Sequence, residues 1–364
     1  MSLTFDLHRR PDPVGDERRA EILANPGFGV HFTDHMVTAI WTKEGGWGAG
    51  AVRPYGPIPL MPSAAVLHYA QEVFEGLKAY RHADGSVWSF RPEANAERMQ
   101  RSARRLALPE LPTEDFLSSL RALVTVDEPW VPPAGTGETS LYLRPFMFAS
   151  EAFLGVRPAN EVTYCLIASP AGAYFAGGLK PVTLWISQHY ARAGAGGTGA
   201  AKTGGNYASS LAGQLEGIEH GCDQAVFLDS STQTYIEELG GMNLFLVTRD
   251  NRLLTPELTG SILEGVTRSS ILQLAKELGL DPEERRIPIE EWKAGVADGE
   301  IREVFACGTA AVVTPVGELR WEGGSAPSTA GDAGGEVTNA IRRALLDIQY
   351  GRAEDTHGWL TRLA

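Results

Sequence analysis

The spacing of apolar residues predicts a chain in which strands dominate the first half and helices are mixed with strands in the second half. Residues 1–24 are polar and charged and are expected to form an arm. An Asp84-Gly85 pair between two apolar runs predicts a hairpin. Helices are expected over 93–107 and from Thr113, where two acidic residues follow in the favourable first turn.

The second half alternates between the two kinds of periodicity, and we interpret the whole as an α+β or mixed α/β protein of two domains. The Gly/Ala-rich segment 171–181 is expected to join a first domain, 1–170, to a second, 182–364. The tract 323–336 is low in complexity and is expected to be a surface loop. Strands are expected at 140–150, 161–170, 182–188, 224–229, 242–248 and 303–316, and helices at 206–221, 265–279, 289–295 and 338–351.

Composition narrows the class of protein. Hydrophobic residues make up 43% and charged residues 21%, so the chain can bury a sizeable core. The net charge of −13 argues against a nucleic-acid or anionic-membrane partner, which needs a basic surface. Cys165, Cys222 and Cys307 form no CxxC and no zinc pattern, and no apolar run is long enough to span a membrane. We therefore expect a cytoplasmic protein without a metal site.

One lysine differs in its setting from the others. Lys202 lies between Gly199 and the pair Gly204-Gly205, just before a helix and among residues too small to cover it. An amine in such a place can be desolvated and act as a nucleophile or a Schiff-base partner. An ordinary loop lysine is the alternative, and spacing alone favours it.

The same stretch matches two nucleotide motifs weakly. Residues 194–199 fit GxGxxG, and Glu216 or Asp223 stands at the distance of the acidic partner of a dinucleotide site. In a tract this rich in glycine, three matched glycines are weak evidence. Residues 196–203 also resemble a P-loop, but Ala201 replaces the glycine that must precede the lysine.

Two segments could bind anions. The segment 263–270 opens a helix, so the N–H groups of Val266 and Thr267 would face a phosphate at the positive helix end. A small-residue turn offers the N–H groups of Thr309 and Ala310 in the same way. The alternatives are a threonine helix cap and a tight strand end.

Two neighbouring glutamates are flanked by apolar residues. Glu237 and Glu238 come immediately before a buried strand, and a buried carboxylate needs a partner. A protonated pyridine nitrogen would be a fitting partner, since such a pair tunes pyridoxal phosphate. A pair of solvated acids at a strand end is the alternative, and the better one for this segment alone.

These segments occur together in one known family. From about Phe28 to the C-terminal helix the chain resembles the branched-chain amino acid aminotransferases, pyridoxal-phosphate enzymes of fold type IV. The resemblance implies a two-domain α+β homodimer with mixed sheets and flanking helices. It also implies ping-pong transamination of L-leucine, L-isoleucine and L-valine with 2-oxoglutarate. The matching blocks, in family order, are FGVHFTDHM, HYAQEVFEGLKAYR, NAERMQRSARRL, SLYLRP, KTGGNYASSL, EELGGMNLF, GSILEGVTRSSIL and GTAAVVTPV.

The resemblance also implies roles for individual residues. Lys202 would form the Schiff base with pyridoxal 5′-phosphate and move the proton between the substrate α-carbon and C4′. Glu238 would pair with the pyridine nitrogen, and Tyr207 would bond the phenolic oxygen. The remaining cofactor-binding residues would be Arg98, Leu263, Gly265, Val266, Thr267 and Thr309.

For the substrate, the resemblance implies an aromatic side-chain pocket and backbone N–H groups for the α-carboxylate. Aromatic walls suit aliphatic side chains through burial and dispersion. Arg144 would help to admit the carboxylate of glutamate. The walls would be Phe28, Tyr69, Phe74 and Tyr142, with Leu154 and Val156 reaching in from a partner subunit, and the carboxylate would bind at Thr309 and Ala310.

Two departures and three rivals accompany this interpretation. Ala311 and Thr314 stand where some family members carry a redox CxxC, so no thiol switch is expected. Gly241 stands where some members carry threonine, which removes one hydroxyl. Within the fold the rivals are a D-amino acid aminotransferase or an aminodeoxychorismate lyase, which should lack the FTDHM and GLKAYR blocks. The others are a nucleotide-binding module using 194–199 and a non-catalytic structural dimer.

Overall fold

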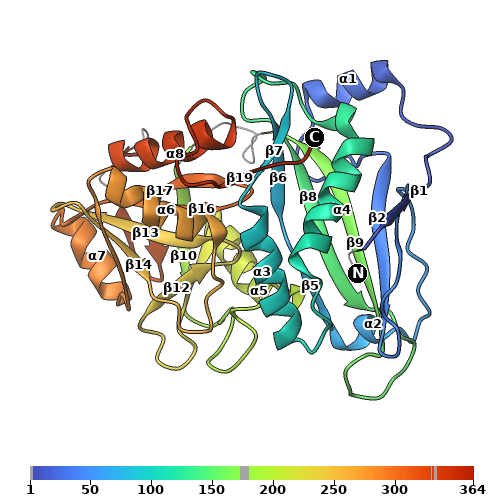
Figure 1. The fold of residues 1–364 in the computed structure, drawn as a ribbon. Coiled ribbons are helices and arrows are strands. Elements are labelled where there is room, and N and C mark those ends of the chain that lie inside the picture. The colour runs from blue at the N-terminus through green and yellow to red at the C-terminus, as the bar shows by residue number, and fades with distance from the viewer. Residues whose placement is uncertain (1–2, 173–179, 329, 332–333) are drawn as a thin grey trace. The chain divides into compact units, whose positions relative to one another are not determined.

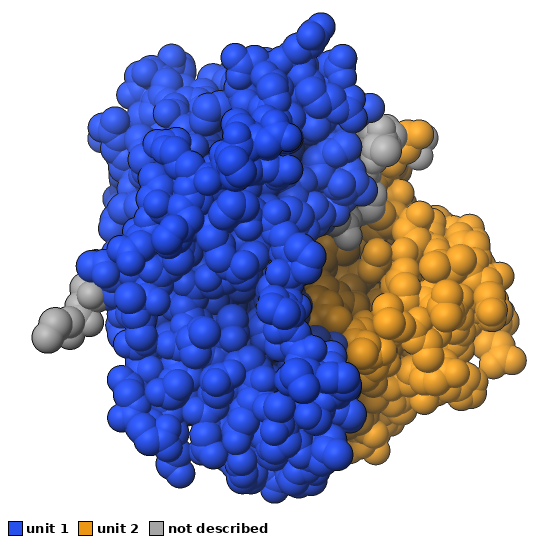
Figure 2. Space-filling view, turned by 90° about the vertical axis from the view of Figure 1, so that its right-hand side faces the viewer, with its two compact units in different colours: residues 1–176, 201–204, 347–364 blue, residues 177–200, 205–346 orange. Residues whose placement is uncertain are grey.

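The chain folds into two compact units. A computed structural model describes residues 3–172, 180–328, 330–331 and 334–364. Unit 1 comprises residues 1–176, 201–204 and 347–364, and unit 2 comprises residues 177–200 and 205–346 (Figure 2). Each unit is built around one β-sheet.

The sheet of unit 1 is almost entirely antiparallel, with strand order β1-β4-β2-β9-β8-β6-β7-β19 (Figure 1). Strand β3 pairs with β2, and β5 pairs with β8. The short β5 lies beside the long central strand β8 and carries part of the candidate site. The elements of unit 1 are β1 (Phe5–Leu7), α1 (Asp16–Ala24), β2 (His35–Thr42), β3 (Gly46–Trp47), β4 (Gly50–Pro54), α2 (Ala65–Tyr69), β5 (Glu72–Phe74), β6 (Leu77–Arg81), β7 (Val87–Phe90), α3 (Pro92–Arg105), α4 (Thr113–Val126), the 3₁₀ turn η1 (Glu128–Trp130), β8 (Ser140–Ala149), β9 (Glu161–Ala171) and β19 (Leu360–Arg362).

The core of unit 1 lies between this sheet and the helices α3 and α4. Phe116, Leu120 and Leu123 recur at helical spacing on α4 and are almost fully buried. Tyr164 of β9 meets them from the sheet side, and its hydroxyl bonds Ser119 at 2.8 Å. Helix α3 is held by the same core, and this fixes the face that carries Arg98 and Ser102.

The sheet of unit 2 is mixed, with strand order β12-β11-β10-β17-β16-β13-β14-β15 and β18 paired to β17. Strand β10 pairs in parallel with β11 and β17, and β14 with β15, whereas the other pairs are antiparallel. The elements are β10 (Val182–Ser187), α5 (Gly204–Glu219), β11 (Gln224–Leu228), β12 (Ile236–Leu239), β13 (Asn243–Thr248), β14 (Arg252–Pro256), α6 (Val266–Glu277), β15 (Asp281–Arg285), α7 (Ile289–Ala297), β16 (Ile301–Gly308), β17 (Val312–Trp321), β18 (Gly324–Pro327) and α8 (Glu336–Gln349).

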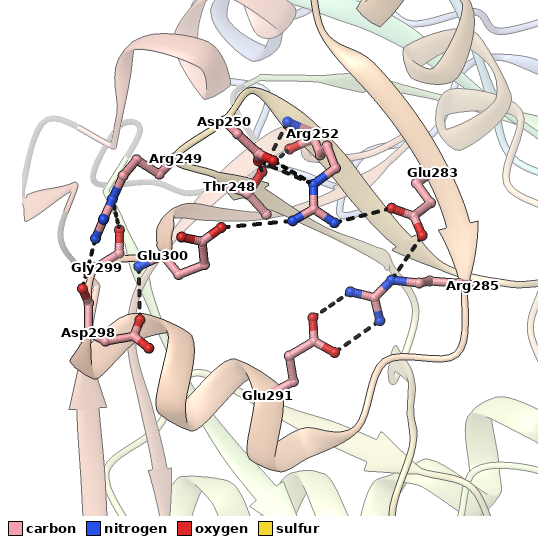
Figure 3. Close-up of polar contacts among 10 residues, drawn as sticks. All are labelled: Thr248, Arg249, Asp250, Arg252, Glu283, Arg285, Glu291, Asp298, Gly299 and Glu300. Carbon is pink, nitrogen blue, oxygen red and sulfur yellow. Dashed lines mark hydrogen bonds and ion pairs between the residues drawn. The ribbon is translucent and has the colours of Figure 1, made fainter.

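Ion pairs secure the edge strand β15 of unit 2 (Figure 3). Arg285 at its end donates to Glu291 of α7 at 2.9 Å and pairs with Glu283 at 3.2 Å. Glu283 in turn lies 3.5 Å from Arg252 of β14. Since an exposed sheet edge can pair with another chain, this charged border also protects it.

The structure differs from the sequence-based expectations in three places. Residues 201–204, which include Lys202, and residues 347–364 belong to unit 1 and not to the expected second domain. The C-terminal segment belongs there because β19 pairs with β7 and Trp359 and Leu363 are buried. The expected strand 303–316 is two antiparallel strands, β16 and β17, which the small-residue turn separates. The expected loop 323–336 contains β18.

The remaining expectations can be compared directly with the elements. The hairpin at Asp84-Gly85 is confirmed by β6 and β7, and the helices at 93–107 and from Thr113 by α3 and α4. The expected arm holds β1, which pairs in parallel with β4, and α1. Most of the expected linker 171–181, residues 173–179, lies outside the described residues. Within the described part, no helix is both long and apolar enough to cross a membrane.

Candidate active site

The backbone around Lys202 is tied into unit 1 by hydrogen bonds on both sides of the lysine. The N–H of Lys202 donates to the hydroxyl of Ser102 on α3 at 2.9 Å, and its carbonyl accepts the N–H of Phe74 on β5 at 3.0 Å. The Gly204 N–H donates to the carboxylate of Glu72, which also accepts from Thr203 at 3.2 Å. Burial raises the pKa of Glu72, and these hydrogen bonds oppose the rise. The lysine is therefore held at a fixed place in the fold and is not on a free loop.

The side chain of Lys202 lies in an aromatic cluster of unit 1. Its Nζ is 4.9 Å from the centre of the Phe74 ring. The guanidinium of Arg144 lies 4.8 Å from the same ring and donates to the Tyr142 hydroxyl at 3.0 Å. The rings of Tyr142 and Phe28 meet edge to face, with centroids 5.1 Å apart. The structure thus brings Lys202 together with three of the four expected aromatic walls.

A buried ion pair stands beside this cluster. Glu75 is fully buried, and Arg98 of α3 donates to both of its carboxylate oxygens at 2.8 Å. Asn95 donates to it at 2.8 Å as well. Burial alone would raise the pKa of Glu75, but the charge of Arg98, followed by its hydrogen bond and the charge of Lys202, brings the pKa below its usual value. Glu75 therefore orients Arg98, the basic residue expected to bind phosphate.

In unit 2 the two acids of β12 are both buried and have different partners. Oε1 of Glu238 forms an ion pair with the Arg192 Nη1 at 2.7 Å and accepts a hydrogen bond from the Leu263 N–H at 2.8 Å. Glu237 accepts a hydrogen bond from the Ser261 hydroxyl, and burial raises its pKa. Glu238 is thus held as an oriented acceptor, whereas solvated acids were the favoured interpretation of this segment alone.

Helix α6 of unit 2 begins with N–H groups that no side chain caps among the described residues. Gly265 precedes it, and a Cβ at this position would overlap the amide oxygen of Asn243, so a larger residue would have to displace that side chain. Asn243 in turn donates to the Leu263 carbonyl at 3.0 Å. Val266 and Thr267 therefore present uncapped N–H groups at the positive end of a helix, which suits a phosphate.

The other expected residues lie on defined elements of their own units. Thr309 and Ala310 form the turn between β16 and β17 in unit 2, and the strained backbone of Val312, with φ +60°, follows directly. Tyr207 lies on α5, where the Arg192 guanidinium is 5.9 Å from its ring centre. A Cβ on Gly241 would stand only 3.4 Å from this ring.

Two expected substrate residues are exposed in the single chain. Leu154 is 63% and Val156 89% exposed, on a loop of unit 1. The Tyr69 hydroxyl on α2 donates to the carbonyl of Leu154, so the fourth expected wall lies next to this loop.

The cysteines and metal-ligating side chains add no further chemistry to the described part of the chain. The three cysteines are free and buried. Burial raises the pKa of Cys307 to about 12, so this thiol is protonated at neutral pH. No group of three or more His, Cys, Asp or Glu side chains in the described residues could hold a metal ion.

Sequence reasoning missed several residues that shape these sites. Ser102 and Asn243 act through hydrogen bonds to distant segments, which sequence spacing does not reveal. Glu75 and Arg192 left a weak signal, because each is a charged residue in or next to a strongly apolar or small-residue stretch. A buried charge in such a place needs a partner, but only the fold shows which one.

Comparison with known proteins identifies the family. Residues 72–319 match the family described as "Amino-transferase class IV". A branched-chain-amino-acid aminotransferase of Mycolicibacterium smegmatis is 59% identical over 99% of this chain and 98% of its own length. The chain belongs to the branched-chain-amino-acid aminotransferases of class IV.

Solved structures of class IV aminotransferases share the fold. The T.th. branched-chain amino acid aminotransferase with pyridoxamine 5′-phosphate aligns with a TM-score of 0.74 at 31% identity, covering 90% of this chain and 98% of that chain. The same enzyme complexed with N-(5′-phosphopyridoxyl)-L-glutamate aligns at 0.72 and 30%, with the same coverage. The fold expected from the resemblance, a fold type IV α+β enzyme with mixed sheets, is confirmed.

Family membership gives the cofactor, since class IV aminotransferases use pyridoxal 5′-phosphate. The residues of this chain fit that group. Unit 1 supplies an amine held by its backbone, and unit 2 supplies uncapped helix N–H groups for a phosphate and a buried, oriented carboxylate for a ring nitrogen. A bare nucleotide-binding module and a non-catalytic dimer are thereby rejected.

We expect Glu75→Gln to destabilise the protein, because it leaves the buried Arg98 without its counter-charge. The free energy of unfolding at pH 7 should fall by about 3–5 kcal/mol. The folded-state pKa of Glu75 lies below 4.5, so its contribution is present at neutral pH and is lost as the pH falls through that lowered value. Denaturant unfolding from pH 7 downward should therefore show the difference between the two proteins shrinking in acid.

The control is Glu128→Gln, which removes the carboxylate of a half-exposed ion pair with Arg81. Its effect should stay below about 1 kcal/mol. Equal stability of wild type and Glu75→Gln at pH 7 would contradict the role given to Glu75.

Proposed function

We propose that this protein transfers the amino group of L-leucine, L-isoleucine or L-valine to 2-oxoglutarate, in two half-reactions at one site. The observation that carries the proposal is Lys202, which three backbone hydrogen bonds around it hold in an aromatic cluster. The family and its relatives support the substrate class. The N-(5′-phosphopyridoxyl)-L-glutamate in the T.th. enzyme structure supports glutamate as the second amino acid.

When bound, pyridoxal 5′-phosphate supplies an electron-withdrawing ring that stabilises negative charge at the substrate α-carbon. The Nζ of Lys202 would take the α-proton of the amino acid and later give it back, so one amine would serve as base and then as acid. Glu238 would accept a hydrogen bond from the ring nitrogen, and Tyr207 would donate to the phenolic oxygen. The phosphate would be held by Arg98, Val266, Thr267 and Thr309, with Leu263 and Gly265 shaping the surrounding backbone.

The aromatic cluster around Lys202 in unit 1 selects among substrate side chains. Phe28, Phe74 and Tyr142 offer ring surface for a branched aliphatic chain. Arg144 lies against two of these rings, and its buried Nε has no hydrogen-bond partner among the described residues. That donor suits the side-chain carboxylate of 2-oxoglutarate, which must bind where leucine binds. The α-carboxylate of either substrate is held by the N–H groups of Thr309 and Ala310.

The protein is proposed to act as a cytoplasmic homodimer. Leu154 and Val156 are large apolar side chains that the single chain leaves mostly exposed. Burial of such residues against a second copy would remove apolar surface from water and would let them help to line the partner's substrate site. The Tyr69 hydroxyl, bonded to the Leu154 carbonyl, would orient this loop.

We expect Lys202→Ala to fold but to lose turnover of L-leucine with 2-oxoglutarate by at least about 10⁴-fold, because no other amine replaces the proton-transferring group. Initial rates of glutamate formation measure this, and circular dichroism checks the fold. The matched control is Lys276→Ala on the exposed side of α6, which should keep the wild-type rate. Normal turnover by Lys202→Ala would refute the proposed function.

Arg144→Met should separate the two substrates. We expect kcat/KM for 2-oxoglutarate to fall by about 10- to 100-fold, because a charge-assisted hydrogen bond is lost. The value for the first half-reaction with L-leucine should change by less than about threefold. Single-turnover kinetics of each half-reaction test this, and equal losses for both substrates would argue against Arg144 as the carboxylate-binding group.

A further inference from the structure

The guanidinium of Arg192 is buried next to Glu238, the acid that the proposed function assigns to the ring nitrogen. Arg192 lies between β10 and α5, and its side chain is 1% exposed. Its Nη1 is 2.7 Å from Oε1 of Glu238, a side chain that is itself 2% exposed. The N–H of Leu263 donates to the same oxygen at 2.8 Å. A guanidinium and a backbone N–H from different segments therefore meet at one carboxylate oxygen.

A glycine makes this placement possible. The Arg192 Nη1 also points to the carbonyls of Ser261, at 3.3 Å, and Gly199, at 3.5 Å. A Cβ on Gly199 would overlap the backbone of Ser261, so these two segments approach this closely only because residue 199 is glycine. The last glycine of the GxGxxG match thus serves the packing around Arg192.

The remaining nitrogens of Arg192, Nε and Nη2, are buried and have no hydrogen-bond partner among the residues that the structure describes. Unpaired buried N–H groups oppose folding, and a guanidinium cannot escape by losing its proton. The reason for a buried guanidinium at this position therefore lies in its effect on the neighbouring groups.

We propose that the guanidinium of Arg192 is a positioning residue that keeps Glu238 ionised and oriented, and thereby keeps the ring nitrogen of the bound cofactor protonated. A carboxylate taken out of water favours its neutral form unless a cation faces it. Arg192 supplies that cation. Its guanidinium also lies 5.9 Å from the ring centre of Tyr207, a second residue assigned to the cofactor.

The other titratable groups around Glu238 do not replace Arg192. Cys307 of β16 is close enough for the two charges to interact, but its thiol is protonated at neutral pH. Glu237, next along β12, bonds Ser261 and carries a pKa raised by burial. Of Cys307, Glu237 and Arg192, only Arg192 carries a positive charge.

The proposal rests on the assignment of Glu238 to the ring nitrogen, and a direct readout is the protonation of that nitrogen. The holoenzyme is loaded with pyridoxal 5′-phosphate labelled with ¹⁵N in the ring, and the ¹⁵N chemical shift is followed from pH 6 to 9. Wild type should show a protonated nitrogen across this range. In Arg192→Gln the midpoint for loss of the proton should fall within this range, at least about one unit below that of wild type, a tenfold change. Arg192→Lys, which keeps a charge but not the planar fork, should show a smaller shift.

The matched control is Arg268→Gln, which also removes a buried guanidinium of unit 2, one that pairs with Glu284 at 2.6 Å. It should lower the unfolding temperature but leave the ¹⁵N titration as in wild type. A wild-type titration in Arg192→Gln would overturn the proposal and leave the proposed function intact. If Arg192→Gln does not fold, a wild-type titration in Arg192→Lys overturns the role of the guanidinium. A neutral ring nitrogen in wild type would instead refute the assignment of Glu238.

Discussion

The fixed position of the Lys202 backbone is the constraint on which the rest of the site depends. A lysine side chain is long and flexible, so its amine reaches a defined place only when its backbone and surroundings are fixed. Here Ser102, Phe74 and Glu72 hold residues 202–204 to unit 1, although the chain before and after belongs to unit 2. The short strand β5 links the lysine segment to the sheet, since it pairs with β8 and also offers the Phe74 N–H to Lys202.

Each unit also contains a buried ion pair at the candidate site, whose two charges are removed from water. Glu75 with Arg98 in unit 1, and Glu238 with Arg192 in unit 2, are almost fully removed from water. Such pairs contribute little net stability, because desolvation offsets their attraction. Their value lies in direction, since the two bonds from Arg98 orient the carboxylate of Glu75, and Arg192 and the Leu263 N–H meet one oxygen of Glu238. This is the arrangement expected of groups that must meet fixed atoms of a cofactor.

Much of this fold could be predicted from local patterns. Helices α3 and α4 and the hairpin of β6 and β7 carry strong periodicity and a turn pair. The pairing of β19 with β7 could not, because three residues near the C-terminus carry too weak a pattern to name a distant partner. The turn at Thr309 was recognised as a candidate anion site, but the apolar residues on both sides concealed that it separates two strands.

The residues of the candidate site could also be predicted only in part. Lys202 was noticeable because of its small neighbours, and Glu238 because of its apolar ones. A definite role for each came only from the family resemblance. Glu75 and Arg192 passed unnoticed because their partners are distant in sequence, and long-range pairing of charges leaves no spacing to find.

The most direct test of the account is the absorption spectrum of the purified protein with pyridoxal 5′-phosphate, recorded before and after L-leucine is added and again after 2-oxoglutarate. The account predicts a visible band that L-leucine bleaches to the pyridoxamine form and that 2-oxoglutarate restores. D-alanine should leave the band unchanged. A protein that stays colourless with added pyridoxal 5′-phosphate, or a band that D-alanine bleaches and L-leucine does not, would contradict it.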